Sequence, residues 1–176
     1  DFNQNCPLVE GCTSLNASNY NSSATIENGS CVFDFIDGIM INEYSAANCD
    51  IQGGNCGDYD DWIEIFNNSS VSVDLQGYYL SDKIGNLTKW QFTEELIISP
   101  NSHVIIYASG LDPSLEVSSF NTSFKLTQTK GSEYIVMTSP EGNVIDYTQL
   151  INHQLNHSVG RNIDGDSNWA IFVNST

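Results

Sequence analysis

The stretch that decides the fold class is DWIEIF, residues 61–66, which follows GDYD at 57–60 and precedes NNSS at 67–70. β-Branched and aromatic residues dominate it, and Gly, Asn, Asp and Ser stand on both sides, which is typical of a strand between two turns. The same pattern continues outward over the rest of the chain from about residue 36. No window of helical length holds apolar residues at helical spacing.

We predict strands at residues 39–44, 61–66, 73–75, 77–80, 89–92, 102–109, 123–126, 133–138, 144–150 and 169–173. So many short strands favour an all-β antiparallel sandwich and exclude the helical fold classes.

Composition excludes several functions. The chain has 176 residues, with 22 Asp and Glu against 5 Lys and Arg, and a formal net charge of −17. Such a chain offers no basic surface to a phosphate backbone, so we expect no nucleic-acid binding, and anionic membrane surfaces are disfavoured. No apolar run approaches the roughly 18 residues that cross a bilayer, so we expect no membrane insertion. The first residue is Asp1, without a signal peptide, so we expect a fragment of a larger secreted protein.

The cysteines stand at positions 6, 12, 31, 49 and 56, without the paired CxxC spacing of zinc sites. Disulfides therefore fit better and indicate an extracellular location. We favour Cys12–Cys31 and Cys49–Cys56, because each pair closes a loop rich in Asn, Gly and Ser. Cys6 then remains, and the nearest alternative is Cys6–Cys12 with Cys31 free.

Residues 11–33, GCTSLNASNYNSSATIENGSCVF, are similar to a short repeat found in tandem in large secreted proteins of Bacteroidetes. That resemblance implies a calcium-linked spacer. However, Ser14, Asn21 and Asn28 stand where the repeat usually has Asp, and calcium prefers carboxylate ligands. We therefore expect residues 1–35 to form an Asn- and Ser-rich spacer closed by a disulfide.

Residues 37–174 resemble the lamin tail domain in its bacterial secreted form. The resemblance rests on pieces in family order, among them INE at 41–43, GDYDDWIEIFN at 57–67, VDLQGYYLSD at 73–82, KWQF at 89–92, VIIYASG at 104–110, SPEGNVID at 139–146 and SVGR at 158–161. It implies an immunoglobulin-like antiparallel β-sandwich at 36–176 and a non-catalytic module appended to a larger protein. It also implies a structural ion pair between Arg161 and a nearby carboxylate.

Calcium is the sharpest site hypothesis. Asp164, Asp166 and Asn168 place oxygen side chains at alternate positions, a spacing that lets a tight turn present several ligands to Ca²⁺. Asp58 and Asp60 form a second acidic cluster just before the strand at 61–66. The alternative is that both segments are solvated turns, which commonly contain Asp and Gly.

The aromatic residues have two interpretations. We expect core packing for Trp62, Trp90 and Trp169. Tyr44, Tyr59, Tyr78 and Tyr79 are instead a candidate stacking platform for a glycan, provided that they are exposed. Because Tyr78 and Tyr79 are adjacent on a predicted strand, they point to opposite faces, and at most one is in the core.

We expect no enzyme activity, because no Ser or Cys has a nucleophile-elbow context for the histidines at 103, 153 and 157. The favoured function is a non-catalytic extracellular module for adhesion, scaffolding or protein–protein interaction, stabilised by Ca²⁺, with an unknown protein or glycan partner at the cell surface. A carbohydrate-binding accessory module is the first alternative, and an exposed aromatic pair would indicate it. A secreted hydrolase domain is the second, and a buried His bonded to Ser or Asp would indicate that.

Overall fold

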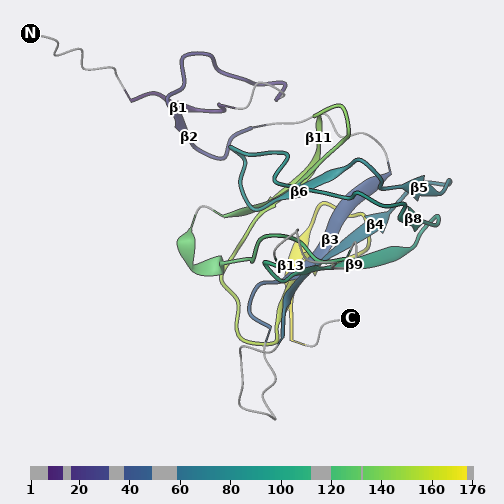
Figure 1. Ribbon diagram of the computed structural model, residues 1–176. Helices are drawn as coiled ribbons and strands as arrows, with labels where there is room; N and C mark the ends of the chain where they lie inside the picture. The colour runs from purple at the N-terminus through teal and green to yellow at the C-terminus, as the bar shows by residue number, and fades with distance from the viewer. Residues whose placement is uncertain are drawn as a thin grey trace, which may run out of the picture. The chain divides into compact units, whose positions relative to one another are not determined.

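The computed structural model describes residues 8–13, 17–31, 38–48, 59–111, 120–131 and 133–173 (Figure 1). The chain divides into two compact units, residues 1–35 and 36–176. Cys6, Cys49, Cys56 and Asp58 lie outside the described residues. No helix in the described ranges is long and apolar enough to cross a membrane.

The first unit is closed by a disulfide. Its strands β1 (Glu10–Gly11) and β2 (Ile26–Glu27) pair in parallel. Cys12 and Cys31 form the bridge that we favoured, which excludes the alternative pairing of Cys12 with Cys6.

The Glu27 carboxylate holds the neighbouring loops of this unit. Its Oε2 accepts hydrogen bonds from the backbone N–H of Thr13 at 2.7 Å and from the Thr13 hydroxyl at 2.8 Å. Its Oε1 accepts another from the Gly29 N–H at 2.8 Å. Burial alone would raise the pKa of Glu27, but these hydrogen bonds outweigh burial and lower it. One carboxylate and one disulfide thus organise a segment with few apolar residues.

The second unit is an immunoglobulin-like antiparallel β-sandwich, as predicted (Figure 1). The five-stranded sheet has the order β13 (Trp169–Phe172), β12 (Ser158–Arg161), β3 (Ile39–Ser45), β4 (Asp61–Asn67), β9 (His103–Ala108). The four-stranded sheet has the order β11 (Val144–Gln149), β10 (Tyr134–Thr138), β6 (Tyr79–Ser81), β7 (Trp90–Gln91). Strands β5 (Val73–Asp74) and β8 (Ile97–Ile98) form a ribbon, and a short 3₁₀ helix η1 covers Gln128–Lys130.

The core lies between the two larger sheets. Ile63 and Ile65 of β4 and Ile106 of β9 are fully buried, as are Ile135 and Met137 of β10. Successive strand residues point to opposite faces, so the residues between these isoleucines point away from the core. They lie on what we call the outer face of the five-stranded sheet.

A bulge in β3 changes which side chains reach the outer face. The register passes from Ile41 opposite Ile65 to Glu43 opposite Glu64, which leaves Asn42 as an extra residue. A bulge of this kind bends the strand and re-aims a side chain. Here it brings both Asn42 and Glu43 to the outer face, while Ile41 stays in the core.

One predicted strand is not formed, and β1, β2, β8 and β12 were not predicted. Residues 123–126, predicted as a strand, form none, because the Thr122 hydroxyl donates to the Phe124 carbonyl at 2.7 Å and closes a local turn. Strand β12 was missed because its sequence SVGR contains Gly160 and only one β-branched residue.

Candidate functional site

Four polar side chains from separate elements meet on the outer face: Asn42 of β3, Glu64 of β4, His103 of β9 and Asp164 of the β12–β13 loop. We call them the outer-face cluster. The Asn42 amide donates to Glu64 Oε1 and to Asp164 Oδ1, at 2.9 Å each. His103 Nε2 lies 3.1 Å from Asp164 Oδ2 and 3.9 Å from Glu64 Oε1. Asn42 therefore links two carboxylates, and His103 faces the same two.

Negative charge in the cluster is poorly compensated. Burial raises the pKa of Glu64, and the charges of Glu43 and Asp164 raise it further, against the opposing effects of Asn42 and His103. Glu43 lies directly opposite Glu64 on the neighbouring strand. Glu43 therefore adds a third carboxylate beside Glu64, whereas the His103 ring faces Glu64 and Asp164.

The predicted calcium turn is divided between two sets of contacts. Asp164 belongs to the outer-face cluster, whereas Asp166 accepts from the Ser167 N–H at 2.6 Å and from the Asn168 amide at 3.1 Å. These hydrogen bonds, that from Asn168 most of all, lower the pKa of Asp166. The structure therefore does not aim the Asp164 and Asp166 side chains at one point.

Asp60, the other described calcium candidate, lies just before β4. Its carbonyl accepts from the Asn48 amide at 2.9 Å. Within the described ranges, Asp60, Asp164 and Asp166 belong to no group of three His, Cys, Asp or Glu ligand atoms within 4.8 Å of one another. Calcium binding stays a prediction.

One such group does exist in the described part of the chain, formed by Cys12, Glu27 and Cys31. Glu27 Oε2 lies 3.3 Å from Cys31 Sγ. Because both sulfurs are joined in the disulfide, they do not present the thiolates that a metal requires. The arrangement belongs to the disulfide-closed unit.

The candidate tyrosine platform is not assembled on one face. Tyr78 packs against the core, whereas Tyr79 precedes the buried Leu80 and points the other way. The Tyr79 hydroxyl accepts from the Gln91 amide at 3.0 Å. Tyr59 is 50% exposed and precedes β4 of the other sheet, and Tyr44 of β3 is fully buried in the core.

A different aromatic pair lies on the outer face. Trp62 of β4 is the register partner of Tyr107 of β9, and Tyr107 is 45% exposed. The predicted core packing holds for Trp90 and Trp169 but not for Trp62, because Trp62 points outward beside the buried Ile63. The sequence does not indicate this pair, because the register between β4 and β9 decides which of their residues are neighbours.

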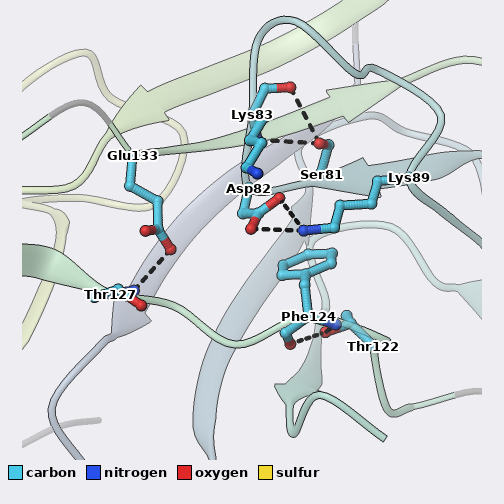
Figure 2. A network of polar contacts seen from close by, with 8 residues as sticks. All are labelled: Ser81, Asp82, Lys83, Lys89, Thr122, Phe124, Thr127 and Glu133. Atoms are coloured by element: carbon cyan, nitrogen blue, oxygen red, sulfur yellow. Dashed lines mark hydrogen bonds and ion pairs between the residues drawn. The ribbon is translucent and has the colours of Figure 1, made fainter. Parts of the chain in front are cut away.

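Figure 2 shows a second group of polar contacts, which lie at strand ends of the four-stranded sheet. Lys89 Nζ lies 2.6 and 2.7 Å from the two oxygens of Asp82, and 5.2 Å from the centre of the Phe124 ring. The buried Glu133 accepts from the Thr127 N–H at 2.7 Å. These contacts join β6, β10 and the segment that follows β9, so the network is structural.

The histidines form no hydrolase triad in the part of the chain that the structure describes. His103 faces carboxylates, and the ring nitrogens of His153 contact the backbone at Ala46 and Gln154. No hydrogen bond joins either ring to a Ser or Cys side chain of the described residues. The arrangement that would indicate nucleophilic catalysis is therefore not found there.

A family model described as Lamin Tail Domain matches residues 36–151. The matched range covers the sandwich from β3 to β11, and strands β12 and β13 follow it. No curated protein matches the chain.

Proposed function

Because the chain belongs to the lamin tail domain family, whose immunoglobulin-like fold is typically non-catalytic, we propose that it is a non-catalytic interaction module of a secreted or cell-surface protein. It serves adhesion, scaffolding or protein–protein contact. The main support for a non-catalytic role is that the buried charged side chains are held in ion pairs within the fold.

Those groups stabilise the fold. Arg161 Nη2 lies 2.8 Å from Asp146 Oδ2 in the interior, which agrees with the ion pair that the family resemblance implied for Arg161. Lys89 is bound to Asp82 in the same manner at a strand end. Groups held in such pairs are poor candidates for acid–base or nucleophilic work, whereas the outer face keeps aromatic and acidic groups at the surface.

The extracellular part of the proposal rests on the Cys12–Cys31 disulfide. Structural disulfides persist in oxidising compartments and are rare in the cytosol. In the described part of the first unit the bridge acts together with the Glu27 hydrogen bonds, in a segment with few apolar residues.

Calcium binding at residues 164–168 is part of the same proposal. The turn offers Asp164 and Asp166, and a shared ion would require Asp166 to leave Ser167 and Asn168. Extracellular calcium is millimolar, so even a weak site fills. The exposed carboxylate of Asp164, 51% accessible, is the ligand most open to an ion.

The test compares binding with turnover for the full chain. Immobilised chain is presented with arrays of basic, acidic and neutral proteins and of neutral glycans, and in parallel with ester, phosphodiester and glycoside substrates. We expect saturable binding to array members and no product above the blank. Hydrolysis that is lost in His103→Ala but kept in His157→Ala would overturn the proposal, because it would make the outer-face cluster an active site.

A further inference from the structure

The outer face of β4 and β9 is the open part of the five-stranded sheet. Towards β3 and β12 the chain buries its own outward side chains, and Glu43, Ser45 and Ser158 are nearly inaccessible. On β4 and β9, in contrast, Trp62 is only partly buried and Tyr107 is 45% exposed. A sheet face with exposed aromatic groups is a common position for binding a partner.

Aromatic and acidic groups are neighbours on this surface. Trp62 and Tyr107 are register partners, and so are Glu64 and Ile105, which come two residues further along the same two strands. Residues two apart on a strand share a face, so the tryptophan ring and the Glu64 carboxylate border the same surface. Asn42 also links Glu64 to Asp164, whose side chain is 51% accessible, whereas that of Glu64 is 13% accessible and lies at the edge of the surface.

The chemistry of this surface is that of cation recognition. An ammonium or guanidinium group binds over the face of a Trp or Tyr ring and is neutralised by a carboxylate beside it. Around Glu64 the negative charges exceed the single imidazole of His103. Two of the chain's five Lys and Arg residues, Lys89 and Arg161, are already paired with Asp82 and Asp146. Lys125 lowers the pKa of Asp61, and among the described residues the ion pairs of Glu64 and Asp164 are with His103 alone, so a partner with positive charge would complete this surface.

Charge complementarity selects one class of occupant. A second copy of a chain with a net charge of −17 is repelled, as are acidic glycans and nucleic acids. A neutral glycan would stack on the aromatic pair but would leave the carboxylates uncompensated. A basic protein segment satisfies both groups and is attracted from a distance.

We propose that the outer face of β4 and β9 binds a basic segment of a partner protein, placing an Arg or Lys side chain over Trp62 and Tyr107 and against Glu64 and Asp164. The inference deepens the proposed interaction function and rests on it.

The experiment uses the full chain and a fluorescein-labelled peptide of repeated Arg-Ser, with a Glu-Ser repeat and a neutral cello-oligosaccharide as comparison probes. Fluorescence anisotropy gives the Kd at about 20 and about 150 mM salt. We expect the Arg-Ser peptide to bind and to weaken with salt. We expect the Trp62→Ala and Glu64→Gln variants each to weaken binding about five-fold or more, in the range of a cation–π contact or a charge-assisted hydrogen bond.

Glu95→Gln is the matched control, since it removes the same charge from an exposed site between β7 and β8. It should change the Kd less than about two-fold. If Trp62→Ala fails to fold, Tyr107→Ser replaces it in the test, because the Tyr107 ring is 45% exposed. This variant should also weaken peptide binding. Circular dichroism melting curves establish folding for each variant.

Other outcomes overturn the inference. Equal weakening by Glu64→Gln and Glu95→Gln would mean attraction by net charge alone. Oligosaccharide binding that Trp62→Ala abolishes would make the face a glycan platform, and a dimer lost in Trp62→Ala would make it a contact between copies. Absence of peptide binding also rejects it. In all these cases the broader proposal of a non-catalytic interaction module is decided separately, by the array binding and substrate turnover experiments.

Discussion

Asp146 and Arg161 meet inside the sandwich and join its two sheets, with 2.8 Å between Asp146 Oδ2 and Arg161 Nη2. The same carboxylate oxygen accepts from the Ile41 N–H at 2.8 Å, and Arg161 Nε donates to the Ile41 carbonyl at 2.9 Å. The guanidinium also lies 5.0 Å from the Trp169 ring centre. The pair therefore holds β3 at the residue just before its bulge.

Removing Arg161 should destabilise the fold strongly. Burial raises the pKa of Asp146, and Arg161 is the main opposing influence, so Arg161→Ala leaves a buried carboxylate without its partner. We expect a loss of about 3–5 kcal/mol in the free energy of unfolding, measured with urea. The double variant with Asp146→Ala should lose less than the sum of the two single losses. Additive losses would contradict the coupling.

Gly160→Ala should destabilise through crowding on the outer face. A Cβ at this position would lie 2.8 Å from Glu43 Cγ and 3.1 Å from the Asn42 carbonyl oxygen. We expect a loss of about 1–3 kcal/mol. Gly85→Ala is the matched control, because a Cβ there meets nothing within 4 Å. Equal urea midpoints for the two variants would show that β12 and β3 adjust without strain.

His153 should make stability fall in acid. The Ala46 N–H donates to Nε2 at 3.2 Å, and Nδ1 lies 3.0 Å from the Gln154 carbonyl oxygen, which requires a neutral ring with its proton on Nδ1. Burial lowers the pKa of His153, although the Gln154 contact opposes this, and a protonated His157 acts in the same direction as burial. A depressed histidine pKa contributes stability above the unfolded value of about 6.5 and loses it as pH falls through the folded value.

The corresponding measurement is the unfolding free energy of wild type minus that of His153→Gln at about pH 8 and about pH 5. This difference should shrink towards acid, and subtraction removes the contributions of the other titrating groups. A difference that is constant with pH would mean that the Ala46 contact survives protonation.

Asp61 should make the protein less stable as pH rises, which is opposite to the effect of His153. Burial raises its pKa to about 6, with Asp60 and Glu133 adding to the shift against Asn48 and Lys125. A raised carboxyl pKa favours folding below the unfolded value of about 3.8, and that contribution is lost as pH rises through about 6. The unfolding free energy of Asp61→Asn minus that of wild type should therefore increase from about pH 4 to about pH 7.5. The expected increase is on the order of 1 kcal/mol after solvent screening. Parallel pH profiles of the two proteins would contradict this.

Calcium should raise the melting temperature if the 164–168 turn binds it. Binding to the native state alone stabilises in proportion to the logarithm of ligand concentration. We expect a shift of several degrees between about 5 mM CaCl₂ and an equal concentration of EDTA, lost in Asp164→Asn and kept in Glu95→Gln. Identical curves would reduce the acidic turns to solvated loops.

Much of the fold was predictable because strand composition and turn residues are local signals. The segments at 61–66 and 102–109 correspond to β4 and β9. The expectation that adjacent Tyr78 and Tyr79 point to opposite faces follows from strand geometry alone, and it agrees with the core packing of Tyr78. Strand β12 carried no comparable signal, because its Gly160 is required by the close approach of Glu43 rather than by strand propensity.

The candidate site was only partly predictable. Asp164 was identified as a ligand candidate, but its expected companion Asp166 bonds within its own turn. Its actual neighbours, Asn42 and His103, are far away in the sequence, and Asn42 is 122 residues from it. They meet because β3, β4 and β9 are adjacent in one sheet, an arrangement that depends on strand order and register.

The sequence by itself determined an all-β chain, a disulfide-closed first segment and a strongly negative surface, because composition, spacing and charge are properties of neighbouring residues or of the whole chain. Only the tertiary structure decided which of the many carboxylates are buried in ion pairs, as Asp146 is with Arg161, and which are linked on the outer face, as the half-buried Glu64 is to the exposed Asp164. The physical reason is that a bulge at Asn42 and the pairing of distant strands set these distances. Burial and nearby charge then determine what each carboxylate does.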